Sequence, residues 1–141
     1  MDALRGRLGT ASVRRRVHGE RGYSIVEAVI TVPVMLGLTM LVVQSALLWH
    51  GRHVAEAAAQ DGLRAARGFG ATAAMGERDA TDYLGQVAPR LLLQPSVEAD
   101  RTATVVTVRV RARVLSVVPF GGFDIEETVA GPVERFVGPP S

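Results

Sequence analysis

The sequence predicts an α+β protein in which a long N-terminal helix carries a small head of one further helix and an antiparallel β-sheet. Two observations predict this fold. The stretch from Ala28 to Trp49 is uncharged and longer than an ordinary surface helix. Residues 106–114 alternate strictly between apolar and polar side chains, which is the period of a half-buried strand. The expected divisions of the chain are a basic leader over residues 1–22, a long helix over 23–70 and the head over 71–141.

The positive charge of the chain is concentrated in the leader. Six arginines stand against two acids there, whereas residues 23–141 hold ten arginines against twelve acids. The basic isoelectric point is therefore poor evidence for nucleic-acid binding, and we interpret the leader as a disordered cytoplasmic segment. The chain has no cysteine, which excludes a disulfide framework and any Cys-based metal or redox site.

The uncharged run predicts one membrane span over residues 28–49. Its 22 residues make about 33 Å of helix, enough to cross a hydrocarbon core. The alternative is a buried core helix, but a small domain could not cover a helix of this length. Pro33 removes one backbone donor and is expected to kink the helix. Since six arginines precede the run and only Arg52 follows closely, the N-terminus is expected in the cytoplasm and the head outside.

The residues around the start of the run carry a family resemblance. Gly22 is followed by Tyr23, and Glu27 is the fifth residue after the glycine. This pattern resembles the class III signal of type IV pilins and pseudopilins, and more closely that of the TadE-like branch of the tight-adherence (Tad) pilus system. The chain departs from the pattern at Val29, where the family has Ala, and the resemblance covers roughly residues 21–70. The matching positions are Arg21, Gly22, Val26, Glu27, Pro33 and Ala65-Ala66-Arg67.

The resemblance implies a membrane-anchored, non-enzymatic component of a Tad or type IV-like pilus assembly system for adhesion or secretion. A prepilin peptidase would cleave it after Gly22, and the mature protein could enter an extracellular filament. The implied partners are the lipid bilayer, the prepilin peptidase, other pilin or pseudopilin subunits and the Tad assembly platform. Two alternatives remain open. One is an uncleaved, single-span accessory or binding protein whose head carries the function, and the other is a minor pseudopilin of a secretion system.

A physical role for Glu27 follows from its position. A carboxylate at the edge of a membrane span is costly unless it has a partner. Cleavage after Gly22 would create an α-amine on Tyr23, four positions from Glu27 and on the same helix face. Glu27 can pair with that amine within one chain, or with the amine of a neighbouring subunit and so set the register of assembly. The simpler alternative is a carboxylate at the cytoplasmic interface, favourable to the positive helix N-terminus.

Beyond the span, the alanine-rich sequence predicts that the helix continues to about Arg67 and stops at Gly68-Phe69-Gly70. His50, His53 and Glu56 recur at spacings of three. A metal site would need a further ligand and a dry setting, so we interpret them as a solvated polar patch.

The head is predicted to contain a helix over 77–88 with acids in its early turns, ended by Pro89 or extended by one turn through 91–93. Strands are expected over 96–99, 106–114 and about 123–130. Turns are expected at Asp100-Arg101 and Gly121-Gly122, and a frayed tail over 138–141.

The central strand carries three arginines on its polar face, Arg109, Arg111 and Arg113. No aromatic residue is interleaved with them, so stacking on nucleic-acid bases has no support. Cross-strand ion pairs are the simpler interpretation, with Glu98, Asp100, Glu126 and Glu127 as the acids on or near the neighbouring strands. No nucleophile with a nearby base and no catalytic carboxylate pair is found. The sequence therefore predicts no enzyme, cofactor, metal or small-molecule substrate.

Overall fold

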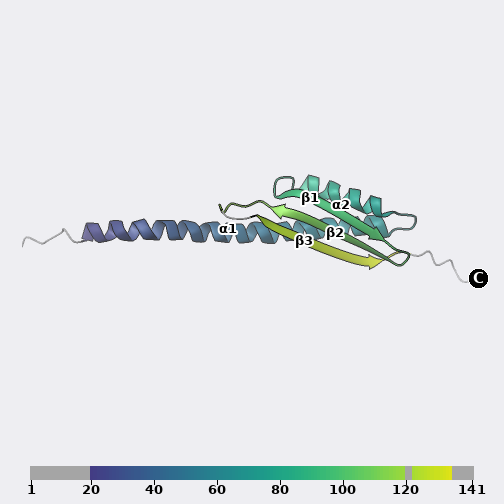
Figure 1. Cartoon of the computed structure of the whole chain (residues 1–141), viewed down its shortest axis with the longest axis horizontal. Helices are drawn as coiled ribbons and strands as arrows, with labels where there is room; N and C mark the ends of the chain where they lie inside the picture. The colour runs from purple at the N-terminus through teal and green to yellow at the C-terminus, as the bar shows by residue number, and fades with distance from the viewer. Residues whose placement is uncertain (1–19, 120–121, 135–141) are drawn as a thin grey trace, which may run out of the picture. The chain divides into compact units, whose positions relative to one another are not determined.

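The computed structural model describes residues 20–119 and 122–134, with side chains from residue 25 onward. Predictions for the leader before residue 20, for Gly121 in the loop and for the tail over 138–141 lie outside this part of the chain. The elements follow the order α1 (Glu20–Arg67), α2 (Ala73–Val87), β1 (Leu92–Arg101), β2 (Val105–Val114) and β3 (Phe123–Pro132) (Figure 1). The predicted α+β class is confirmed. The chain divides after Gly37 into two compact units.

Helix α1 contains 48 residues and continues through Pro33 without interruption. Proline has no amide hydrogen, so the carbonyl of Val29 lacks its helical donor there. The helix ends at Arg67 as predicted, and Gly70 adopts the left-handed conformation (φ 74°) that glycine tolerates best. The last carbonyls of α1 accept hydrogen bonds from the end of β1 and from the segment just after β3. Glu134 N–H donates to the Arg67 carbonyl (3.0 Å), and the Arg101 guanidinium donates to the Ala66 carbonyl.

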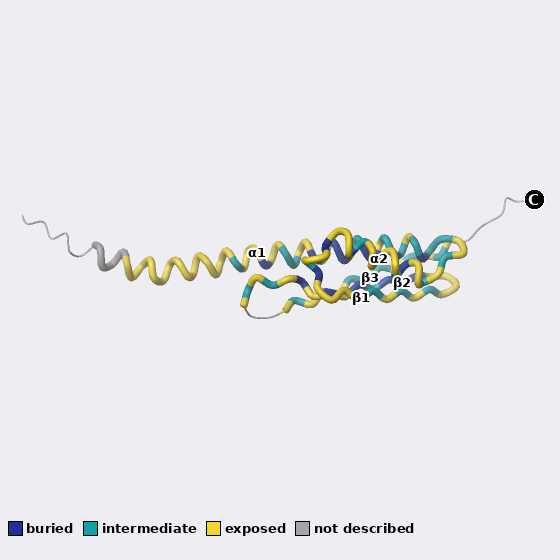
Figure 2. The backbone as a smooth tube through the Cα atoms, turned by 90° about the horizontal axis from the view of Figure 1, so that it is seen from above, coloured by how far each residue is buried: buried dark blue, intermediate teal, exposed yellow. Residues whose placement is uncertain are grey.

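In the second unit, α1 and α2 cover one face of a three-stranded antiparallel sheet of order β1-β2-β3 (Figures 1 and 2). Strand β2 is central and turns a row of valines toward the helices. Alanines of α1 lie opposite, and their small side chains allow the helix backbone to approach the sheet closely. The fully buried members of this contact are Val106, Val108 and Val110 of β2 and Ala55, Ala58 and Ala59 of α1.

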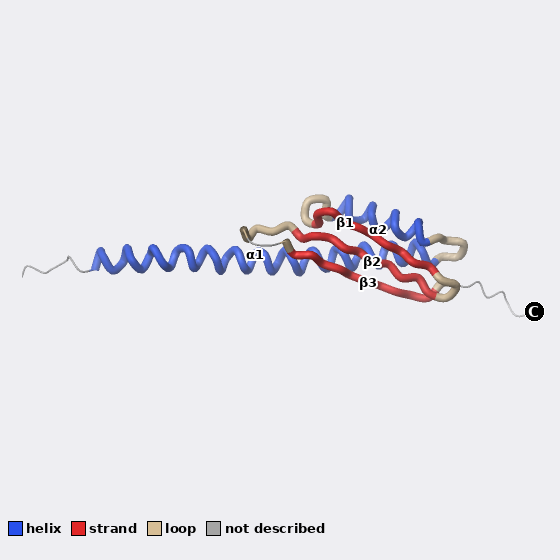
Figure 3. The backbone as a smooth tube through the Cα atoms, in the orientation of Figure 1, coloured by secondary structure: helices blue, strands red, loops and turns tan. Residues whose placement is uncertain are grey.

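Strand β1 begins at Leu92, four residues before the predicted start at Ser96. The sequence prediction failed here because Pro95 cannot donate to a ladder. The structure accommodates it with an irregularity between Leu93 and Ser96, where Gln94 takes a positive φ of 49°. Both predicted residues of the following turn belong to β1, and Thr102 closes the turn by accepting a hydrogen bond from Val105 N–H (3.0 Å). The chain reverses at one end of the sheet there, and the β2–β3 connection leaves from the other end (Figure 3).

Helix α2 begins at Ala73, one turn before the predicted start, and has no acid in its first turn. Tertiary packing explains the earlier start. A Cβ atom on Gly76 would lie 2.7 Å from the Gly62 carbonyl oxygen and 2.8 Å from the Ala66 Cβ, so α2 meets α1 almost backbone to backbone. The helix ends at Val87, before Pro89. A single turn follows, in which the N–H groups of Leu91 and Leu92 both donate to the Ala88 carbonyl (3.3 Å each), and it stops at Leu92 because that residue pairs with Val114.

This close approach predicts opposite effects for two glycine substitutions in α2. Gly76→Ala should lower the free energy of unfolding by about 1–3 kcal/mol, because the added methyl group overlaps the backbone of α1. Gly85→Ala should leave it unchanged or raise it by up to about 1 kcal/mol, because nothing lies within 4 Å of its Cβ position and alanine favours the helix. Denaturant titration of the full chain in detergent micelles measures both. Equal destabilisation by the two variants would contradict the helix–helix contact.

Candidate functional site

The predicted processing residues lie at the beginning of α1. Gly22 and Tyr23 fall in its first turn, since the helix begins at Glu20, and their side chains lie outside the described residues. Glu27 follows one turn later and is exposed. With Ala28, Thr31 and Val32 it lines an open hollow of about 300 Å³. The geometry between Glu27 and an amine on Tyr23 therefore stays a prediction.

Glu27 is the only charged residue between Tyr23 and Arg52. Its carboxylate has no partner among the residues described, and the side chains that follow it on α1 are exposed and apolar, such as Val29 and Ile30. In lipid, a carboxylate in this setting requires a cation or a hydrogen-bond donor. The chemistry open to Glu27 is therefore pairing with a positive group supplied near the helix N-terminus, from the same chain or from another.

The apolar surface of α1 is continuous from Ile25 to Val43, where the large apolar side chains described are mostly exposed (Figure 2, yellow). Within the described residues this is the one helix that is long and apolar enough to cross a membrane, by length and composition. The surface changes at Gln44, which is only 3% exposed. Leu47 and Leu48 also pack against the head core, so one side of the helix already contacts the head within the last six residues of the expected span, 28–49.

Gln44 makes contacts that sequence reasoning missed. Its Nε2 donates to the Leu115 carbonyl (3.4 Å), and its Oε1 accepts from Val117 N–H (2.9 Å). The amide thus joins α1 to the segment that follows β2, more than seventy residues away. The signal in the sequence is a glutamine near the far end of an uncharged run, and this alone does not distinguish a polar residue tolerated in a membrane helix from one that binds the head.

The histidines beyond the run form local contacts on the helix surface. The His53 ring lies edge-on to Trp49, with ring centroids 4.3 Å apart, and its Nδ1 lies 3.9 Å from a carboxylate oxygen of Glu56. Both side chains of the His53–Glu56 pair are about half exposed. Over residues 25–119 and 122–134, no group of three or more potential metal ligands was found.

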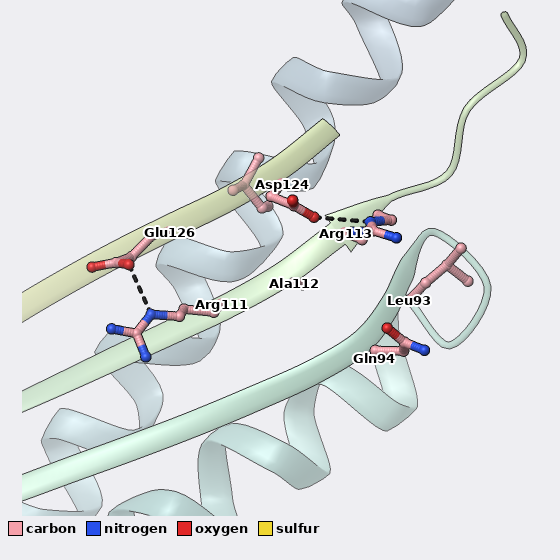
Figure 4. Close-up of a pocket in the computed structure, with 8 residues that line it drawn as sticks. Leu93, Gln94, Arg111, Ala112, Arg113, Asp124 and Glu126 are labelled. Atoms are coloured by element: carbon pink, nitrogen blue, oxygen red, sulfur yellow. Dashed lines mark hydrogen bonds and ion pairs between the residues drawn. The ribbon is translucent and has the colours of Figure 1, made fainter. Parts of the chain in front are cut away.

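The three arginines of β2 form an ionic face on the side of the sheet away from the helices (Figure 4). Arg111 Nε lies 2.8 Å from Glu126 Oε2, and Arg113 Nε lies 2.9 Å from Asp124 Oδ1. Arg109 and Arg111 also share Glu98 across the other strand pair.

The predicted cross-strand pairing is confirmed for two of the four acids, Glu98 and Glu126. Asp124 takes the place expected for Glu127, because Glu127 lies opposite Val110 and so on the helix-facing side of β3. Asp100 lies opposite Thr107 and has no ion pair among the described residues.

A shallow hollow of about 370 Å³ opens on this ionic face between Leu93, Gln94 and the paired charges. The charges that line it are already neutralised by one another. The hydrogen bond from Arg113, with the attraction of its charge, holds the pKa of Asp124 below its usual range. The hydrogen bond from Arg111 likewise lowers the pKa of Glu126. The arrangement therefore fixes the sheet and offers no free charge among these residues for an anionic ligand.

The fold and the N-terminal segment define an α+β head on a long apolar helix, with Glu27 as the only charged residue between Tyr23 and Arg52. Residues 22–64 match the protein family described as TadE-like protein. The match begins at Gly22 and includes Tyr23, Glu27 and Pro33, so the resemblance expected from the sequence is confirmed over this segment. Searches of curated proteins and of solved structures found no match.

The ionic face predicts a pH-dependent contribution to stability. Because the pKa of Glu126 is lowered in the folded state, its contribution is present above the unfolded value near 4.5 and is lost as the pH falls through the folded pKa. Glu126→Gln should lower the melting temperature slightly at neutral pH, and the difference from the parent should vanish in acid and shrink with added salt. Glu127→Gln removes the same charge from the other face of β3 and is the control. An acid-insensitive difference for Glu126→Gln would contradict the pairing.

Proposed function

We propose that the protein is a TadE-like pilin or pseudopilin, a membrane-anchored and non-enzymatic component of a Tad or type IV-like pilus assembly system. The observation that carries this proposal is the family match, which starts at Gly22 and covers α1 through its apolar surface. Pilin-type subunits and the Tad assembly platform are the partners that this family favours. Adhesion and secretion are the two processes such a system serves.

The anchor is the exposed apolar part of α1. Apolar side chains that no protein surface covers are stable in lipid, and a helix satisfies its own backbone hydrogen bonds there. The arginine-rich leader stays in the cytoplasm, since cytoplasmic flanks of spans carry the excess of arginine. The head then lies on the extracytoplasmic side and can pass into an extracellular filament.

The functional segment is Gly22 to Glu27. A prepilin peptidase removes the leader after Gly22, and the new amine on Tyr23 provides the cation that Glu27 needs. When the amine belongs to a neighbouring subunit, the pair sets the register between helices. The isolation of Glu27 on an apolar helix surface supports this role, because a mismatched register would leave the carboxylate unpaired in lipid.

Cleavage predicts a defined mature N-terminus. The mature chain should begin at Tyr23, and Gly22→Val should retain the leader, because a branched side chain beside the scissile bond prevents close backbone approach by the peptidase. Gly19→Val is the matched control and should be cleaved normally. Mass spectrometry of membrane extracts measures all three proteins. A full-length parent chain would reject cleavage and favour the uncleaved accessory protein.

Register pairing predicts a separate effect at Glu27. Glu27→Gln should be inserted and cleaved normally but should enter assemblies severalfold less, because the neutral amide cannot form an ion pair with the amine. Glu56→Gln, which neutralises another exposed carboxylate of α1, is the control. Co-isolation of differently tagged copies after chemical crosslinking measures assembly. Equal crosslinking of the parent and Glu27→Gln would remove the register role.

A further inference from the structure

One end of the head carries an apolar loop, residues 115–119, named here the rim loop. Its sequence, Leu-Ser-Val-Val-Pro, has no charged residue. Leu115 is 40% exposed and Val117 is 37% exposed. Three large apolar side chains in five residues, partly open to the surroundings, indicate a surface that something else covers.

The position of the rim loop is fixed against α1. A Cβ atom on Gly51 would lie 2.9 Å from Val114, which shows that the end of β2 is level with Gly51. The chain then continues toward the N-terminal end of the helix and reaches Gln44, seven residues or about 10 Å farther along the axis. The two residues that precede Gln44 on the helix, Val42 and Val43, are exposed and apolar. The loop is therefore level with the end of the exposed apolar surface of α1.

The length of that surface matches a bilayer. Residues 25–43 make about 28 Å of helix, close to the hydrocarbon thickness of about 30 Å. Gln44 then marks the point where α1 leaves the hydrocarbon. Trp49, which is 67% exposed, follows about 7.5 Å later, at the headgroup level where tryptophan is favoured.

The backbone of the rim loop is suited to a place with little water, where unpaired polar groups are costly. Leu115 N–H donates to the Leu91 carbonyl (2.9 Å), and Val117 N–H donates to Gln44. The Ser116 hydroxyl donates to the Val118 carbonyl (3.0 Å), and Pro119 has no amide hydrogen. Several polar groups of this loop are thus paired within the protein, while its leucine and valine side chains are partly exposed.

We propose that the rim loop is seated in the membrane surface on the head side of the bilayer and that Gln44 holds it there. The partner is lipid, because the loop continues the exposed apolar surface of α1 and carries no charge. Two attachments, the helix and the loop, then fix the tilt of the head relative to the bilayer before assembly. This inference rests on the membrane anchor of the proposed function.

The test uses the absence of cysteine from the chain, which makes a single introduced cysteine a unique labelling site. The uncleaved full chain is reconstituted in phosphatidylcholine vesicles with a nitroxide on Val117→Cys, and collision rates with oxygen and with a water-soluble nickel complex are measured. Ala103→Cys, exposed in the turn at the opposite end of the sheet, is the aqueous control. Val34→Cys, on the exposed apolar surface, is the lipid control. The oxygen-to-nickel ratio at 117 should exceed that at 103 severalfold.

The controls separate the inference from the proposed function. A lipid signal at 34 with an aqueous signal at 117 overturns the rim-loop proposal alone. An aqueous signal at 34 overturns the membrane anchor and the proposal with it. Dipolar broadening between labels at 117 on different copies also overturns the proposal, because it assigns the loop to a contact between copies.

Gln44 has its own test in the Val117→Cys background. Gln44→Leu keeps an apolar helix but loses both hydrogen bonds to the loop, so the nitroxide should become more mobile and its oxygen-to-nickel ratio should fall. Ser45→Ala is the control, because its hydroxyl bonds only the Leu41 carbonyl one turn back. An unchanged spectrum for Gln44→Leu would show that Gln44 does not hold the loop. The Val117→Cys measurement without this substitution tests the seating of the loop in the membrane even if the Gln44→Leu variant does not fold.

Discussion

The head depends on the contact between the alanine face of α1 and the valine face of β2. Ala55, Ala58 and Ala59 have no exposed surface, and the valines opposite them are equally buried. Alanine contributes little apolar area by itself, so the stability comes from how closely it lets a helix lie on a sheet. Gly62 and Gly76 extend the same principle to the contact between the helices. Small side chains thus dominate the contact of α1 with the sheet, and Tyr83 and Phe123 pack at the margin of the core.

The charges on the other face of the sheet follow from the same arrangement. Because one face of β2 is committed to valine, its arginines must all lie on the other, where they would repel one another without acids on both neighbouring strands. The acids on β1 and β3 meet that requirement, and Glu126 serves two arginines at once. This face is a structural consequence of the core, and the residues proposed for processing and assembly lie elsewhere, at the beginning of α1.

The parts of the fold that were predictable are those with a local signal. The alternation in β2 determines its face, and Glu98 and Glu126 were correctly expected to pair with its arginines. Asp124 was missed because the register of β3 decides which of its acids share the arginine face. The starts of α2 and β1 were missed because each depends on a distant partner, Gly62 for the helix and the ladder at Val114 for the strand. Gln44 was missed for the same reason, since no local pattern indicates that a glutamine binds a loop seventy residues away. At the N-terminus, Glu27 was identified because an isolated charge in an apolar run is itself a local signal.

The end of α1 receives hydrogen bonds from Arg101 and from Glu134, which lies beyond the last strand. The ribosome releases these residues long after the helix itself. The final turn of α1 therefore keeps open carbonyls until residue 134 has been synthesised and the head has folded. A chain truncated before Glu134 loses the N–H group that caps the Arg67 carbonyl, and only the bond from Arg101 to the Ala66 carbonyl can still cap the helix.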